Sequence, residues 1–153
     1  MKQKQSWSSS LVPQIHKFGG ASVADADAIR HAVSIVRDLS CGPIVVAVSA
    51  MAGVTDSLID VADHAAQGDR KGVDRRIYEL AKRHRLVAQQ LVKGKNLAAA
   101  LLRDIEAHFQ VLSEVAHGLI ALRGVTARSR DYILARGEML SVLLFAAAAR
   151  AGG

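Results

Sequence analysis

The chain has 153 residues, a formal net charge of +6, half apolar residues and 22% charged residues. This length is sufficient for one domain, and the composition excludes an intrinsically disordered chain. Only 4% of the residues are aromatic, too few for the stacking surfaces that bind single-stranded nucleic acid. The excess positive charge therefore favours a small phosphorylated ligand, with no nucleic-acid partner.

The single cysteine, Cys41, excludes an internal disulfide framework and indicates a reducing compartment, the cytoplasm. Residues 1–10 lack the apolar segment of a secretory signal and are predicted to form a disordered tail. Because no stretch of about 18 uninterrupted apolar residues occurs, no contact with a membrane is expected.

The first elements in chain order are a strand, a helix and a second strand, which form a βαβ unit. Residues 15–18 are a short apolar strand that ends at two glycines, and residues 44–48 are an aliphatic run typical of a strand covered on both faces. Ser22 is predicted to cap the intervening helix, with Asp25 three positions on. The buried face of that helix is predicted from apolar residues at helical spacing: Ile29, Val33, Val36 and Leu39.

Four more helices are predicted downstream, at residues 55–67, 73–92, 97–122 and 127–150. The 97–122 helix has the most regular apolar stripe, formed by Leu97, Leu101, Ile105, Phe109, Leu112, Val115, Leu119 and Leu122. Two parallel strands are too few to support so many helices. Residues 11–153 are therefore predicted to be the leading part of a larger α/β domain that lacks its remaining strands.

The first candidate site is the loop after the first strand. Lys17 supplies a charge there, and Gly19 and Gly20 let the backbone approach a bulky phosphate group. Neither a Walker loop nor a dinucleotide-binding fingerprint is present. A tight strand-to-helix turn with a solvated lysine explains these few residues equally well.

The second candidate site is the loop after the second strand, at residues 49–55. If the strands are parallel, both loops open at the same edge of the sheet, where α/β proteins place ligands. Ser49 and Thr55 then offer hydroxyl groups to one ligand. The alternative role for Thr55 is helix capping, which leaves its hydroxyl hydrogen free.

The third candidate is Glu138, which follows the helix-interior Gly137 and shares a helix face with Leu134, Ser141 and Phe145. Burial among such residues is costly for a carboxylate unless a cation pairs with it, and a substrate ammonium group would serve. The alternative is an ion pair with Arg136 or another basic side chain.

The six histidines are dispersed, and no spacing among them suits a metal site, so none is predicted in the protein. His84 lies on an apolar stripe and is expected to be a core or boundary residue rather than a ligand. The basic run at residues 71–85 is interpreted as a solvated helix face, with contact to nucleic acid as the weaker alternative.

Together, these stretches resemble the aspartate kinases, within the amino-acid kinase fold. The family's K-F-G-G-[TS]-S-V loop corresponds to Lys17-Phe18-Gly19-Gly20-Ala21-Ser22-Val23, with alanine in place of the usual hydroxyl residue. The S-A-x-x-x-x-T-[ND] loop corresponds to residues 49–56, and the G-E-x-x-S helix to residues 137–141. Order and spacing agree from residue 13 onward. The resemblance implies an α/β three-layer sandwich, of which only the leading βαβ unit and a helical segment are present.

The resemblance also implies a reaction, in which the γ-phosphoryl group of ATP passes to the β-carboxylate of L-aspartate and gives 4-phospho-L-aspartate. This step begins the lysine, threonine and methionine pathways. It implies that Lys17 stabilises the transferring phosphoryl group as a catalytic residue. Mg²⁺ would arrive with the nucleotide, and the full-length parent would be a homo-oligomer. The implied nucleotide contacts are Lys17, Phe18, Gly19, Gly20 and Ser22, and the implied aspartate contacts are Ser49, Thr55 and Glu138.

The family's nucleotide-binding half and regulatory ACT domains have no counterpart here, so the chain alone is expected to be inactive. Two other functions are kept as alternatives. One is another amino-acid kinase, of the acetylglutamate or uridylate type. The other is a non-enzymatic helical module that binds nucleic acid through residues 71–85.

Overall fold

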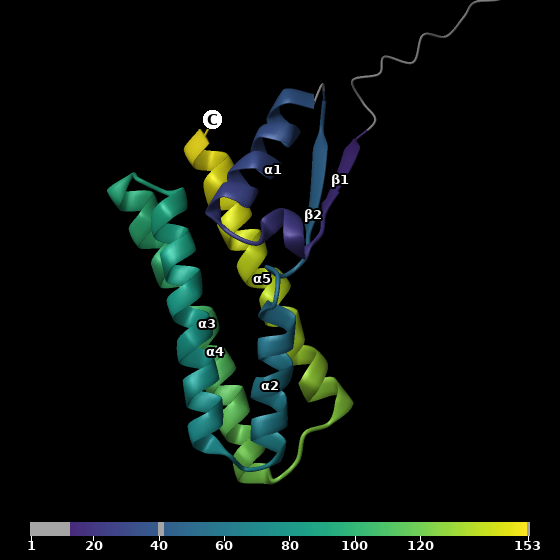
Figure 1. Cartoon of the computed structure of the whole chain (residues 1–153), viewed down its shortest axis with the longest axis vertical. Helices are drawn as coiled ribbons and strands as arrows, with labels where there is room; N and C mark the ends of the chain where they lie inside the picture. Colours follow the sequence, from purple (N-terminus) through teal and green to yellow (C-terminus); the bar gives the residue numbers. More distant parts are fainter. Residues whose placement is uncertain (1–12, 40–41, 153) are drawn as a thin grey trace, which may run out of the picture.

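The computed structural model describes residues 13–39 and 42–152 (Figure 1). In chain order they form strand β1 (Gln14–Phe18), the 3-10 helix η2 (Gly20–Val23), helix α1 (Ala26–Leu39), strand β2 (Ile44–Val48), and helices α2 (Val54–Ala66), α3 (Arg70–Leu91), α4 (Lys95–Leu122) and α5 (Ala127–Gly152). The predicted strands and long helices are confirmed, with boundaries shifted by a few residues. The predicted tail at residues 1–10 and Cys41 lie outside the described residues.

Strands β1 and β2 pair in parallel, with Phe18 opposite Val48, and α1 connects them. The predicted βαβ unit is therefore confirmed, and both strands end at the same edge of the sheet. The inner face of the sheet carries Phe18, Val46 and Val48, which pack against the helical core.

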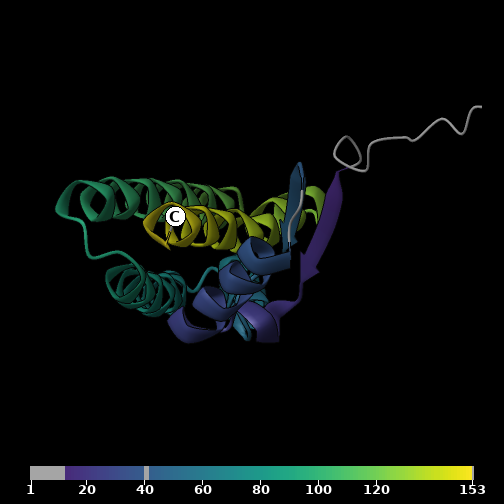
Figure 2. The ribbon, with the colours of Figure 1, turned by 90° about the horizontal axis from the view of Figure 1, so that it is seen from above.

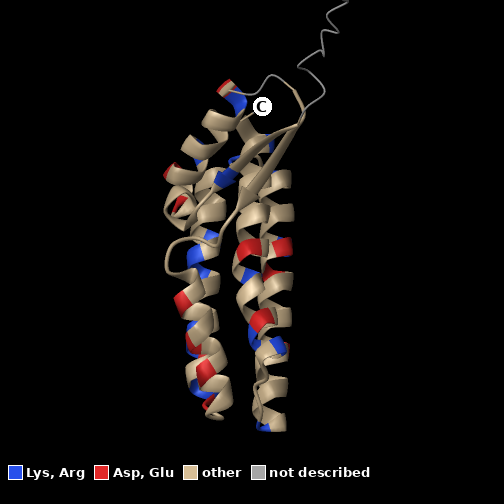
Figure 3. Ribbon diagram, turned by 90° about the vertical axis from the view of Figure 1, so that its right-hand side faces the viewer, with Lys and Arg blue, Asp and Glu red and all other residues tan. Residues whose placement is uncertain are grey.

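The expectation that residues 44–48 are covered on both faces is wrong for the described part of the chain. On the outer face, Ile15 is 75% exposed and Val45 is 52% exposed. Figure 3, with the strands toward the viewer, shows no helix of the described residues in front of them. An aliphatic run predicts burial only where a second layer is present to provide it.

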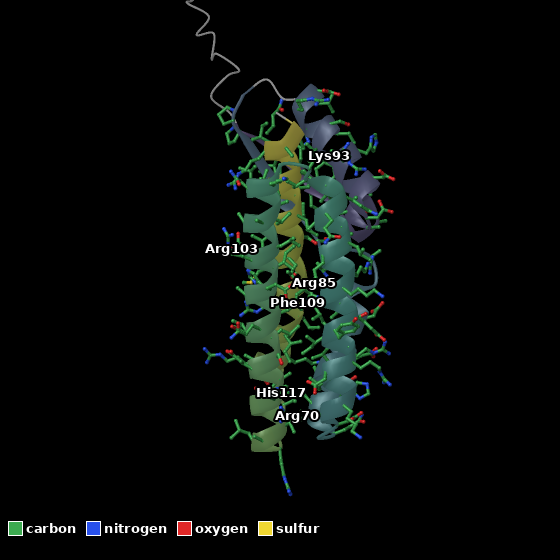
Figure 4. All side chains as sticks on the ribbon, turned by 90° about the vertical axis from the view of Figure 1, so that its left-hand side faces the viewer. Arg70, Arg85, Lys93, Arg103, Phe109 and His117 are labelled. Atoms are coloured by element: carbon green, nitrogen blue, oxygen red, sulfur yellow. The ribbon has the colours of Figure 1, made fainter. Side chains whose placement is uncertain are left out.

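Helices α2 to α5 run alongside one another and hold most of the core (Figures 1 and 2). Helices α3 and α4 lie side by side, with Phe109 between them (Figure 4). Arg85 of α3 donates two hydrogen bonds to Glu106 of α4, one of them 2.8 Å long, and the pairing lowers the pKa of Glu106. Farther along the same helix pair, Nε2 of His117 in α4 lies 2.6 Å from Oδ1 of Asp74 in α3.

The predicted buried face is correct in the middle of α4 and only half-buried at Val33 and Val36 of α1, and it is wrong at the last residue of both helices. Leu101, Ile105 and Phe109 are buried as expected, but Leu39 and Leu122 are 62% and 80% exposed. Both are the last residues of their helices. A periodic apolar stripe can continue to the last residue of a helix. The neighbouring elements that cover the stripe can end before that residue, which then stays exposed.

One predicted helix cap is also wrong. Asp25, rather than Ser22, caps α1, because its Oδ1 accepts a hydrogen bond of 2.9 Å from the N–H of Ala28. Ser22 lies inside η2, where its N–H donates to the carbonyl of Gly19. The short 3-10 turn moves the start of α1 beyond the reach of Ser22.

Within the described ranges, α5 is the one helix long and apolar enough to cross a membrane by length and composition alone. Half of its apolar window is buried by the rest of the structure. Its central residues, including Ile133, Leu140 and Leu144, belong to the core that the bundle shares. This arrangement is that of a core helix in a globular domain.

Candidate functional site

The loops that follow β1 and β2 touch one another. The N–H of Ser49 donates to the carbonyl of Phe18 at 3.0 Å, and the N–H of Ala52 donates to the carbonyl of Gly20 at 3.2 Å. A Cβ atom on Gly20 would lie 2.9 Å from the carbonyl oxygen of Ala50. Only glycine therefore fits at position 20 without movement of the second loop, and the predicted adjacency of the two loops is confirmed.

Helix α5 reaches the same place through Gly137. A Cβ atom on Gly137 would lie 2.8 Å from Cβ of Ala50, 3.2 Å from Cδ1 of Leu58 and 3.3 Å from Cγ1 of Val54. This contact explains why a glycine interrupts the interior of a long helix. The three sequence motifs therefore meet at Ala50, which is 95% buried between Gly20 and Gly137.

Lys17 and Gly19 lie where the first loop is open. Lys17 is exposed on the outer face of β1, opposite Ala47, and its side chain forms no hydrogen bond or ion pair within the described residues. No atom lies within 4 Å of the position that a Cβ on Gly19 would take. An accessible backbone beside an unpaired lysine fits the phosphate groups of a nucleotide.

Phe18 and Ser22, on either side of the glycines, differ in exposure. The ring of Phe18 is buried against Phe145, with 5.7 Å between ring centroids, so that any contact of Phe18 with a nucleotide has to come from its backbone. Ser22 is exposed in η2.

The hydroxyl residues of the second loop border Ala50 and the start of α2. Ser49 is half-buried and follows β2 directly, and Thr55 is exposed as the second residue of α2. The capping role considered for Thr55 is wrong, because the N-cap residue is Gly53, in a left-handed conformation with φ of 74°. No hydrogen bond in the described structure uses the hydroxyl of either Ser49 or Thr55, so both remain able to bind a ligand.

Glu138 is exposed, so the burial considered in the sequence analysis does not occur. The ion pair considered with Arg136 is also absent. The buried guanidinium of Arg136 instead bonds to the hydroxyl of Tyr132, lies 4.4 Å from the centre of that ring, and contacts Nδ1 of His108 at 3.2 Å. No other basic side chain of the described chain pairs with Glu138, which leaves its carboxylate accessible next to Gly137.

Arg83 is a site residue that the sequence pattern did not predict. Residues 71–85 were interpreted as a solvated face, and Lys82 is indeed exposed, but Arg83 is half-buried and donates hydrogen bonds to both loops. His84, by contrast, was correctly expected to be a core or boundary residue: it is fully buried, and burial lowers its pKa to about 4. Arg83 directly precedes this core histidine, but the sequence gives no signal of which carbonyl groups it reaches.

Among residues 13–39 and 42–152, no group of three or more histidine, cysteine, aspartate or glutamate side chains could hold a metal ion. The residues at the loops are a lysine, glycines, hydroxyl residues and one glutamate. This set suits anionic phosphate groups and one cation, rather than direct coordination of a metal by the protein.

The sequence model of the Amino acid kinase family matches residues 13–153, so the chain belongs to this family. Aspartokinase 3, a chloroplastic protein of Arabidopsis thaliana, is 30% identical over 133 residues, which are 87% of this chain and 23% of that protein. The aspartokinase of Chlamydia trachomatis is 33% identical over 132 residues, 86% of this chain and 26% of that protein. The chain therefore spans about a quarter of the length of these relatives.

The crystal structure of E. coli aspartokinase III in complex with aspartate and ADP superimposes with a TM-score of 0.78 and 23% identity. The match covers 92% of this chain and 29% of the E. coli chain. The expected fold, a partial amino-acid kinase fold with a short parallel sheet and a large helical segment, is confirmed. The resemblance to aspartate kinases noted from the motifs is confirmed by the named relatives.

Proposed function

We propose that this chain forms part of an aspartate kinase, which transfers the γ-phosphoryl group of ATP to the β-carboxylate of L-aspartate. The observation that carries the proposal is the meeting of Gly20, Ala50 and Gly137, which brings all three motifs to one place. In this proposal, Glu138, the residue that follows Gly137, serves the same site as Ser49 and Thr55. The similarity to named aspartokinases supports this reaction over others in the family.

In this proposal, the first loop binds the phosphate groups of the nucleotide. MgATP supplies the phosphoryl group when bound. Lys17 places its charge where negative charge increases during transfer, and the backbone at Gly19 and Gly20 approaches the phosphate oxygens. The backbone of Phe18 and the hydroxyl of Ser22 complete this contact. Positioning and electrostatic stabilisation account for most catalysis in phosphoryl transfer, so these residues need no covalent role.

The second loop and α5 bind the amino acid. Ser49 and Thr55 donate hydroxyl hydrogen bonds to L-aspartate, and the exposed carboxylate of Glu138 pairs with its ammonium group. This pairing favours aspartate over N-acetylglutamate, because acylation removes the positive charge that a carboxylate would recognise. A free α-ammonium group is thus the feature of the substrate that the site selects.

The exposed outer face of the sheet supports the view that residues 11–153 are the leading part of a larger catalytic domain. Ile15 and Val45 lie there at 75% and 52% exposure, in a fold whose sheets are covered on both sides. In this proposal the longer parent chain is a cytoplasmic homo-oligomer in the pathway to lysine, threonine and methionine. The chain by itself catalyses no aspartate-dependent ATP turnover.

An NMR titration tests the proposal residue by residue. Magnesium–ADP should shift the amide signals of Gly19 and Gly20, and L-aspartate should shift those of Ser49 and Thr55. Lys17→Gln should weaken the ADP response, whereas Lys82→Gln, a matched change at an exposed lysine of α3, should not. One result would refute the kinase assignment and favour the nucleic-acid alternative. An oligonucleotide would shift the amide signals of α3, while neither magnesium–ADP nor L-aspartate would shift those of the loops.

A second measurement addresses the part played by the rest of the parent chain. ADP formation is followed with ATP and L-aspartate, with the chain at high concentration. The expected rate equals the background rate. Robust turnover that Lys17→Gln abolishes would show that the chain is catalytically sufficient and would overturn the proposed need for a longer domain.

A further inference from the structure

Arg83 of α3 joins the two site loops through one guanidinium group. Its Nη1 donates to the carbonyl of Ala52 at 2.9 Å, and its Nη2 donates to the carbonyl of Ala24 at 3.0 Å. Ala24 follows η2 directly, and Ala52 lies between Ser49 and Thr55. Arg83 is 59 residues from one acceptor and 31 residues from the other, so the contact ties together segments that are distant in sequence.

The two acceptors belong to loops that already touch. The N–H of Ala52 donates to the carbonyl of Gly20, while the carbonyl of Ala52 accepts from Arg83. Ala52 is therefore held through both of its backbone groups: its N–H is bonded to the first loop, and its carbonyl is bonded to α3. Because a guanidinium is planar and presents its donors in a fixed fork, it holds two carbonyl oxygens at a set separation, which a lysine ammonium cannot do.

The guanidinium of Arg83 has no carboxylate partner next to the loops in the described part of the chain. Its two hydrogen-bond acceptors are neutral carbonyl groups, and no carboxylate within the described residues forms an ion pair with it. Burial is the main cause of the lowered pKa of the adjacent His84, and the positive charge of Arg83 lowers it further. An arginine paired with a carboxylate would only hold the loops together. Arg83 holds the loops and also adds a positive potential next to them.

We propose that Arg83 is a positioning residue of the candidate site, one that fixes the loops after β1 and β2 relative to each other and favours an anion between them. It does not itself touch the substrate. The proposal rests on the assignment of a phosphate-binding role to the first loop. It goes beyond that assignment, because Arg83 lies on a helix that carries none of the three motifs.

The test compares Arg83→Lys and Arg83→Met with Lys82→Met, a change at the adjacent exposed lysine. The first readout is hydrogen exchange at the amide of Ala52, relative to the buried amide of Ile105 in α4. Loss of the fork should speed exchange at Ala52 by about tenfold in both Arg83 variants, with Ile105 unchanged. Lys82→Met should leave both amides as they are.

The second readout is the affinity for inorganic tripolyphosphate, from the shifts of Gly19 and Gly20 at a temperature where every variant is fully folded. We expect a loss of about tenfold in Arg83→Met and an intermediate loss in Arg83→Lys, which retains the charge without the fork. A change in stability alone would not move this readout.

Two results would overturn the proposal. Equal acceleration at Ala52 and Ile105 would mean that Arg83 supports the whole fold rather than the loops. Faster exchange at Ala52 with unchanged affinity would mean that the tie has no bearing on the site. If the unaltered chain binds neither tripolyphosphate nor ADP, the phosphate-binding role proposed for its first loop fails, while exchange at Ala52 still decides whether Arg83 fixes the loops.

Discussion

Replacement of Gly137 by alanine is the most direct test of how the site is assembled. The new Cβ would lie 2.8 Å from Cβ of Ala50, about 1 Å inside the usual carbon–carbon contact distance of about 3.5–4.0 Å. Leu58 and Val54 close off two other directions, at 3.2 and 3.3 Å. Either α5 or the second loop therefore has to move.

The expected magnitude is the difference between two effects. Overpacking of a core costs about 1–3 kcal/mol. Alanine in a helix interior is more favourable than glycine by about 1 kcal/mol. Gly137→Ala should therefore destabilise the chain by about 1 kcal/mol net, although the substitution improves the helix propensity of α5.

Gly118 provides a matched control, because it is an exposed residue inside α4 with no atom within 4 Å of its missing Cβ. Gly118→Ala should stabilise the chain by about 0.5–1 kcal/mol. Urea unfolding followed by circular dichroism measures both variants. Ala50→Gly in the Gly137→Ala background should recover part of the loss, with a coupling of about 1 kcal/mol between the two positions. Equal stabilisation by both alanine variants would refute the close packing of α5 on the second loop.

Two further predictions concern stability. Asp25→Ala should cost about 1 kcal/mol, because the cap of α1 is lost, whereas Ser22→Ala should change the free energy of unfolding by less than about 0.5 kcal/mol; the reverse order in urea unfolding would restore Ser22 as the cap. Burial lowers the pKa of His84 from 6.5 to about 4, so the unfolded chain binds more protons than the folded chain between these values. Stability should accordingly fall as the pH drops from 6.5 toward 4, by up to about 3 kcal/mol from this residue. His84→Leu should reduce that slope, and an unchanged difference in urea midpoint between pH 7 and pH 4.5 would show that His84 is not responsible.

The long helices could be predicted from sequence because each carries apolar residues at a 3.6-residue period and ends at a recognisable break. The ends of these stripes were less predictable, as the exposure of Leu39 and Leu122 shows. Local pattern determines which residues share a face, whereas neighbouring elements determine how much of that face is covered. The same reasoning explains the exposure of Glu138. The sequence indicates which residues share its helix face, but not whether another element covers that face.

The adjacency of the loops after β1 and β2 was also predictable, because parallel strands end at one edge of a sheet. What the sequence could not supply was the contact between that edge and the helices. Gly137 packs on Ala50, and Arg83 reaches Ala24 and Ala52, through contacts that depend on the path of the whole chain. The predictions of helix caps were wrong for a different reason. Several residues near the start of each helix have suitable side chains, and short turns determine which of them becomes the cap.

The outer face of the strands has one more consequence, for solubility. Its side chains are Ile15, Lys17, Val45 and Ala47, so Lys17 is the one charged group on that face of the described strands. An exposed apolar sheet face promotes association between molecules through that face, and a lysine on it opposes such association. In the described chain, the residue proposed to act on phosphate would thus also oppose association through this face, and an apolar replacement at this position would lose both properties at once.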